Sequence, residues 1–98
     1  MSLNGYRLSY SQEGPTMNEM WLRCLLYKGM FSDEMAIKYS FHGKEISVFV
    51  PKQMVNGEPD QQGTVKVKVF EEGGTRWAVL PNSQSAVVPI EDEDLIPA

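Results

Sequence analysis

A strict alternation of apolar and other residues dominates the middle of the chain. Large apolar side chains occupy every second position within residues 35–41, and the same pattern returns within residues 46–50. A period of two is that of a β-strand with one buried face, and His42-Gly43-Lys44 between the two runs is typical of a tight turn. Pro51 ends the second run, because proline cannot donate a ladder hydrogen bond. The segment predicts a β-hairpin.

A second hairpin is predicted over residues 65–80, where two runs rich in Val, Phe and Trp flank Gly73 and Gly74. Two turns fit this sequence. A two-residue loop of Gly73-Gly74 places Phe70 opposite Trp77. Trp77 would then share a face with Lys66, Lys68, Phe70 and Val79.

The other turn has three residues, with Gly74 in the left-handed conformation, and it shifts the register by one residue. Trp77 then lies with the valines of residues 65–69 in the core. The number of large apolar side chains that this register buries favours it, so we expect a core Trp77. In both registers Lys66 and Lys68 share the face of Phe70.

Residues 16–28 fit two periodicities. As a helix, the segment has a capping box formed by Thr16 and Glu19, and Gly29 stands at the position after its end. As a strand, it has two largely apolar faces. We favour the strand, because Leu22 and Leu26 fall outside the apolar stripe of a one-sided helix.

The remaining segments lie before, between and after these predicted strands. Residues 1–16 are a poorly ordered lead-in, residues 56–63 form a mobile polar loop, residues 85–90 form a short strand, and residues 91–98 form an acidic tail or turn. We therefore expect a mainly β fold over residues 1–98. It is a single-domain small barrel or a strongly bent antiparallel sheet of five or six short strands, with one short N-terminal helix as the alternative for residues 16–28.

The C-terminal part of the chain resembles the end of small barrels of the Src-homology type. The resemblance rests on a Gly-closed hairpin, a short strand that ends in Val88-Pro89, an acidic turn and then Leu95-Ile96. It implies a barrel-like shape and no particular function, since such barrels carry many unrelated activities.

Composition and charge narrow the function classes. The chain is 42% hydrophobic and 22% charged, which is the balance of a folded protein and not of a disordered one. Its formal net charge of −4 opposes binding to polyanions, so we do not expect nucleic acid or a membrane as the partner. Cys24 is the single cysteine, which suits a reducing compartment, and we expect a cytoplasmic protein.

The candidate chemical groups each have an ordinary structural explanation. His42 is the single histidine and lies in a turn, where a solvated side chain is expected. Cys24 lies in an apolar segment and is expected to be a small buried hydrophobic residue. The acidic residues 91–94 lack the glycine turn of a calcium-binding loop. We therefore predict no enzyme activity, no cofactor and no metal.

The surplus of apolar residues on both faces of several strands favours an interaction module, which binds a protein partner or a second copy of itself. The possible interaction face consists of Lys66, Lys68, Phe70, Arg76 and Trp77. A first alternative is binding of single-stranded nucleic acid through Lys66, Lys68 and Phe70. A second alternative is a small-ligand site near residues 56–63.

Overall fold

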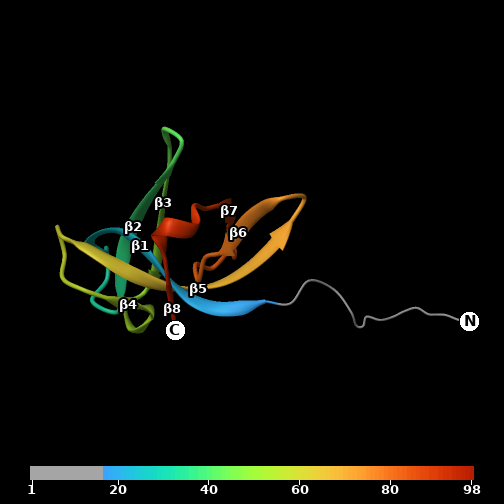
Figure 1. Ribbon diagram of the computed structural model, residues 1–98. Helices are drawn as coiled ribbons and strands as arrows, with labels where there is room; N and C mark the ends of the chain where they lie inside the picture. Colours follow the sequence, from blue (N-terminus) through green and yellow to red (C-terminus); the bar gives the residue numbers. More distant parts are fainter. Residues whose placement is uncertain (1–16) are drawn as a thin grey trace, which may run out of the picture.

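The computed structural model describes residues 17–98, and its strands form one antiparallel sheet bent into a half-barrel (Figure 1). The strands are β1 (Asn18–Lys28), β2 (Glu34–Phe41), β3 (Lys44–Pro51), β4 (Val55–Asn56), β5 (Gln62–Glu72), β6 (Thr75–Val79), β7 (Val87–Pro89) and β8 (Leu95–Pro97). Two short 3-10 helices are η1 (Lys52–Met54) and η2 (Asp92–Asp94). The predicted mainly β fold and strongly bent sheet are confirmed.

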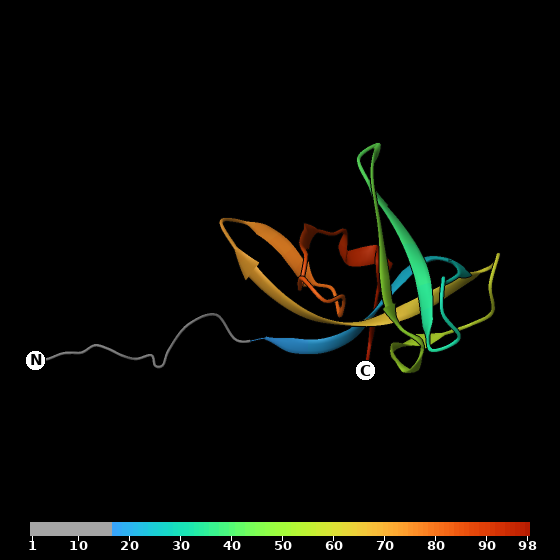
Figure 2. The ribbon, with the colours of Figure 1, turned by 180° about the vertical axis from the view of Figure 1, so that it is seen from behind.

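The strand order is β3-β2-β1-β5-β6-β7, while β4 pairs with β5 and β8 pairs with β1. The two hairpins β2–β3 and β5–β6 rise as separate arms, and the segment from β7 to β8 lies between them (Figure 1). Seen from behind, β1 and β5 run along the base that joins the two arms (Figure 2). Within residues 17–98 there is no helix of the length and apolar character needed to cross a membrane.

Residues 18–28 form a strand, so the helical interpretation of this segment is wrong. β1 pairs with β5 along one edge and with β2 and β8 along the other, which makes it a central strand. Leu22, Cys24 and Leu26 are buried on its inner face, and Trp21 and Tyr27 are half-buried on its outer face. This two-sided environment explains the apolar residues that a one-sided helix would have left exposed.

The β2–β3 hairpin is confirmed in its predicted place. Its loop consists of His42 and Gly43, with φ angles of +49° and +82°, and Phe41 pairs with Lys44 on either side. Two positive φ angles in a two-residue loop define the turn whose twist matches that of the flanking strands.

The core fills the concave side of the half-barrel and draws side chains from both arms. Its buried residues are Leu22, Cys24, Leu26, Met35, Ile37, Tyr39, Val50, Val65, Val67, Val69, Ala78, Leu80, Val88 and Ile90. The inner faces of β1, β2 and β5 supply most of them, in the period-two pattern expected from the sequence.

The C-terminal segment is part of the sheet, so the tail predicted over residues 91–98 is wrong, whereas the acidic turn predicted at residues 91–94 is present. After η2, strand β8 pairs antiparallel with β1, with Ile96 opposite Trp21 and Leu95 opposite Leu22. A hairpin, a short strand, an acidic turn and a last strand thus follow one another in the order noted from the sequence.

Two other predicted segments have different bounds in the structure, and a third cannot be compared with it. The predicted strand 85–90 is shortened to residues 87–89, and the predicted loop 56–63 is reduced to residues 57–61 because β4 and β5 take its ends. The backbone amide of Asp60 donates to the Leu26 carbonyl at 2.7 Å, which ties this loop to β1. The predicted lead-in, residues 1–16, lies outside the described residues.

Candidate functional site

The β5–β6 turn decides which side chains form a surface. Gly73 and Gly74 make a two-residue loop with φ angles of +65° and +79°, and Phe70 lies opposite Trp77. The expected three-residue turn and core position of Trp77 are therefore wrong. The apolar residues of the hairpin alone favour the other turn, whereas Ala78 and Leu80 pack fully buried among residues of other strands and complete the core without Trp77.

The observed register builds an outer surface over three strands, which we call the aromatic face. Phe70, Trp77 and Pro89 form one cross-strand row, and Lys68, Val79 and Val87 form the next. Phe70, Trp77, Val79 and Pro89 are half-buried, and Val87 is 50% exposed. The face lies on the side of the sheet opposite the buried side chains of Val69 and Ala78.

Trp77 makes one hydrogen bond on this face. Its indole Nε1 donates to the carbonyl of Glu72 across the turn at 3.3 Å. Phe70 and Pro89 flank it on the neighbouring strands. An aromatic side chain fixed in this way presents contact area with little rotational entropy left to lose on binding.

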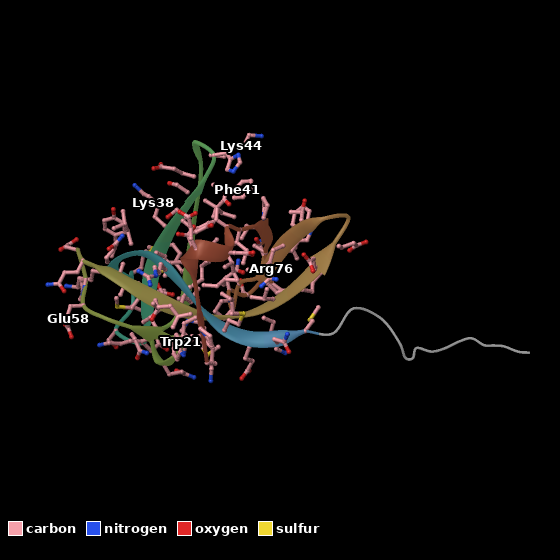
Figure 3. The ribbon with its side chains drawn as sticks, viewed as in Figure 1. Trp21, Lys38, Phe41, Lys44, Glu58 and Arg76 are labelled. Atoms are coloured by element: carbon pink, nitrogen blue, oxygen red, sulfur yellow. The ribbon has the colours of Figure 1, made fainter. Side chains whose placement is uncertain are left out.

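Lys66 and Lys68 lie on the outer side of the sheet with Phe70, as predicted, whereas Arg76 does not. Lys68 is exposed beside the aromatic face, and Lys66, further along β5, lies 3.8 Å from a Glu19 oxygen and 5.7 Å from the centre of the Trp21 ring. Arg76 alternates with Trp77 along β6 and therefore points to the opposite, concave side. Figure 3 shows Arg76 between the two arms and Trp21 on the far side of the sheet.

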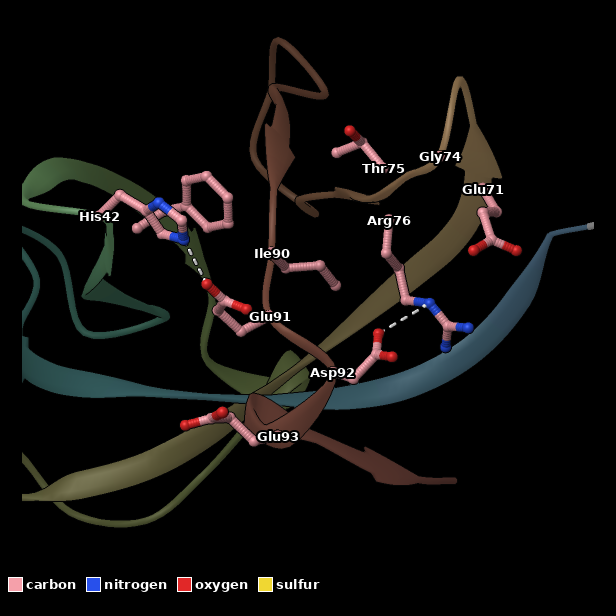
Figure 4. Close-up of a pocket in the computed structure, with 10 residues that line it drawn as sticks. His42, Glu71, Gly74, Thr75, Arg76, Ile90, Glu91, Asp92 and Glu93 are labelled. Carbon is pink, nitrogen blue, oxygen red and sulfur yellow. Dashed lines mark hydrogen bonds and ion pairs between the residues drawn. The ribbon is translucent and has the colours of Figure 1, made fainter.

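Arg76 belongs instead to a polar cleft between the arms (Figure 4). The cleft has a volume of about 360 Å³ and is lined by Phe41, His42, Glu71, Gly74, Thr75, Arg76, Ile90, Glu91, Asp92 and Glu93. Arg76 Nε lies 3.0 Å from Asp92 Oδ1, and His42 Nε2 contacts Glu91 Oε1. His42 is exposed, as expected for a turn residue, but its contact with Glu91 could not be predicted because the two residues are distant in the chain.

These pairs join the tip of one arm and the strand β6 to the segment that precedes β8. Arg76 is paired with the Asp92 carboxylate and His42 contacts the Glu91 carboxylate, so polar contacts connect both arms to this segment. Among residues 17–98, His, Cys, Asp and Glu side chains form no group of three that could hold a metal ion.

Tyr39 anchors the same segment from inside the core. Its hydroxyl donates to Asp94 Oδ2 at 2.8 Å and accepts a hydrogen bond from the Glu91 backbone amide at 3.0 Å. Burial, followed by the hydrogen bond and negative charge of Asp94, raises the pKa of Tyr39 well above its ordinary value of 10.0.

Cys24 is buried, as predicted, among the core residues of β1. Burial raises the pKa of its thiol from 9.0 to about 12, which keeps it protonated and poorly nucleophilic at neutral pH.

Comparisons with known proteins add no family to this description: no protein-family model matches the chain, and neither a curated protein nor a solved structure is detectably similar to it. Its candidate sites therefore rest on the geometry above. The sequence does not show that Val87 and Pro89 belong to the aromatic face, because their positions depend on the pairing of β7 with β6.

Proposed function

We propose that this domain is a non-enzymatic protein-interaction module and that its partner docks on the aromatic face. The observation that carries the proposal is the register of the β5–β6 hairpin, which puts Phe70 and Trp77 side by side on the outer surface. Contiguous apolar patches on a protein surface are typical of protein-binding sites, and on this one four side chains are half-buried and Val87 is exposed.

The composition of the face supports a protein partner. Trp77 is a rigid aromatic anchor near the middle of the face, and aromatic anchors of this kind dominate the binding energy of many interfaces. Lys68 and Glu19 provide charged groups at its border. The partner that fits is an apolar segment whose polar flanks reach these two charges.

The alternative of nucleic-acid binding has less support than the sequence suggested. Arg76 faces the other side of the sheet, and Lys66 is already engaged by Glu19 and Trp21. One exposed lysine beside Phe70 offers little counterion release in a protein of net charge −4. We also propose a cytoplasmic location, because the single cysteine needs no oxidising compartment.

The test is a selection of peptides from a random displayed library on the Trp21→Phe variant, in which Trp77 is the remaining tryptophan. We expect selected peptides to shift the emission of Trp77 and protect it from acrylamide. Phe70→Ala should weaken their binding by roughly tenfold, a typical effect for a central apolar contact. The control is Phe49→Ala, which removes a 47%-exposed aromatic side chain from the other arm.

Peptides that bind without changing Trp77 emission and tolerate Phe70→Ala would overturn the proposal, as would a selection that yields no binder. Protection of Trp77 that grows with the concentration of the protein alone would identify the partner as a second copy.

A further inference from the structure

The half-barrel leaves two strands at the ends of its sheet, β3 on one arm and β7 on the other. An end strand offers unpaired backbone amides and carbonyls to another strand unless proline, a bulge or a charge blocks it. The two ends differ sharply in this respect.

The β7 edge is blocked. The amide of Ile90 donates to Arg76, and the carbonyl of Ala86 accepts from Leu80, so the even-numbered residues of this segment face β6. Val87 and Pro89 therefore face outward, and Pro89 has no amide to donate. A strand added here would find one donor, at Val87.

The β3 edge is open. Its two-residue turn makes Phe41 and Lys44 a hydrogen-bonded pair, so the even-numbered residues of β3 bond to β2. Lys52 follows the same rule: its residue number is even, and its amide donates to the carbonyl of Asp33, before β2, at 2.9 Å. The backbone groups of Glu45, Ser47 and Phe49 thus point away from the sheet.

Nothing in β3 interrupts this edge before Pro51. The pairing with β2 runs without a bulge from Phe41–Lys44 to Glu34–Pro51. Residues 45–50 contain no proline, glycine or lysine. Ile46 and Val48 are half-buried on the concave side, where they pack against the core.

We propose that β3 pairs antiparallel with β3 of a second copy, about a two-fold axis at Ser47, so that two half-barrels share one continuous sheet. In this register the outward-facing backbones of Glu45 and Phe49 meet, Ser47 meets its own copy, and each pair exchanges two hydrogen bonds. On the concave side Ile46 lies opposite Val48, which joins the apolar surfaces of the two copies.

The charges of β3 are compatible with a second copy and favour the antiparallel direction. A parallel pairing in register would place Glu45 beside Glu45 and Lys44 beside Lys44, whereas the antiparallel pairing places Glu45 opposite Phe49 and Lys44 opposite Val50. The strand is therefore complementary to itself in one orientation, as a two-fold interface requires. This interface is independent of the aromatic face, which lies on the other arm.

The test combines sedimentation velocity with residue-resolved amide exchange of the wild-type protein over a dilution series. We expect a monomer–dimer equilibrium in which the amides of Glu45, Ser47 and Phe49 become protected as the dimer forms, while the amide of Val87 exchanges freely. Ser47→Pro removes an outward donor without touching the β2 ladder, and it should weaken dimerisation by roughly tenfold or more. Ser47→Ala, which keeps the amide, should dimerise like the wild type.

A monomer at every concentration would overturn the proposal. A dimer that leaves these three amides unprotected would also do so, because the second copy would then sit elsewhere. If Ser47→Pro fails to fold, the amide exchange of the wild type decides the matter alone. A peptide from the library that protects the same amides in a wild-type protein that never dimerises would replace the second copy with a different extended partner.

Discussion

The hydroxyl of Tyr39 donates a hydrogen bond to the carboxylate of Asp94 at 2.8 Å, although the two residues stand 55 positions apart in the chain. The same oxygen accepts the backbone amide of Glu91 at 3.0 Å. One buried side chain of β2 thus fixes both ends of the turn that leads into β8, and the closing of the C-terminal segment depends on it.

Replacing Tyr39 with Phe is expected to lower the free energy of unfolding by about 1–3 kcal/mol, because it leaves the Glu91 amide and one Asp94 oxygen without their partner. Urea unfolding followed by circular dichroism measures this change. The matched control is Tyr27→Phe, which removes a hydroxyl from the outer face beside Lys38 and should cost less. Equal costs for the two variants would contradict the anchoring role of Tyr39.

Cys24 and Tyr39 predict a loss of stability at alkaline pH. Both have a folded-state pKa above the ordinary value, about 12 against 9.0 for Cys24 and above 10.0 for Tyr39. The folded state therefore holds these protons more tightly than the unfolded state does. The contribution of Cys24 is complete below pH 9.0 and is lost as the pH rises from 9.0 toward 12, and that of Tyr39 is lost as the pH rises above 10.0.

Urea unfolding at pH 7.5 and at pH 10.5 tests this sign. The wild type should lose more stability between the two values than Cys24→Ala or Tyr39→Phe loses. A decline that is the same in all three proteins would assign the alkaline effect to other groups. The thiol of Cys24 should also resist a soluble thiol reagent in the native state and react once urea unfolds the protein.

The parts of the fold that the sequence predicts are those fixed by neighbouring residues. The alternation around His42-Gly43 specifies the β2–β3 hairpin, and the apolar residues on both sides of residues 18–28 specify a central strand. The β5–β6 register escaped prediction because the apolar residues of the hairpin alone favour the three-residue turn, and only packing of Ala78 and Leu80 with distant strands favours the observed one.

In the candidate site, too, features set by neighbouring residues were predictable and features set by distant pairings were not. Lys66, Lys68, Phe70 and Trp77 lie on one side of the sheet because they follow one local register, and Arg76 lies on the other side for the same reason. The partners that complete the surface or the cleft, such as Pro89 and Asp92, come from pairings that no local pattern encodes.

The two-residue turn predicts that position 73 tolerates few side chains. Gly73 has a φ of +65° and no atom near its missing Cβ, so the cost of a substitution there is conformational. Gly73→Val should lower the free energy of unfolding by roughly 1–2 kcal/mol, and Gly73→Asn should be tolerated, because Asn adopts the left-handed conformation more readily. Thermal unfolding measures both variants. A harmless Gly73→Val would favour the three-residue turn, in which only Gly74 needs a positive φ.

The pairing of β8 with β1 predicts that the last residues stabilise the sheet. Ending the chain at Asp94 removes Leu95 and Ile96, which are half-buried opposite Leu22 and Trp21. The free energy of unfolding should fall by roughly 2 kcal/mol or more, since two partly buried aliphatic side chains and a strand pairing are lost. Removing Ala98 alone, which lies beyond β8, is the matched control and should change little. In a Trp77→Phe background, the longer truncation should also shift the emission of Trp21 to the red, because Ile96, which lies opposite Trp21 on β8, is lost and water reaches the indole. Equal stabilities of the two truncated proteins, with unchanged Trp21 emission, would instead describe a solvated tail.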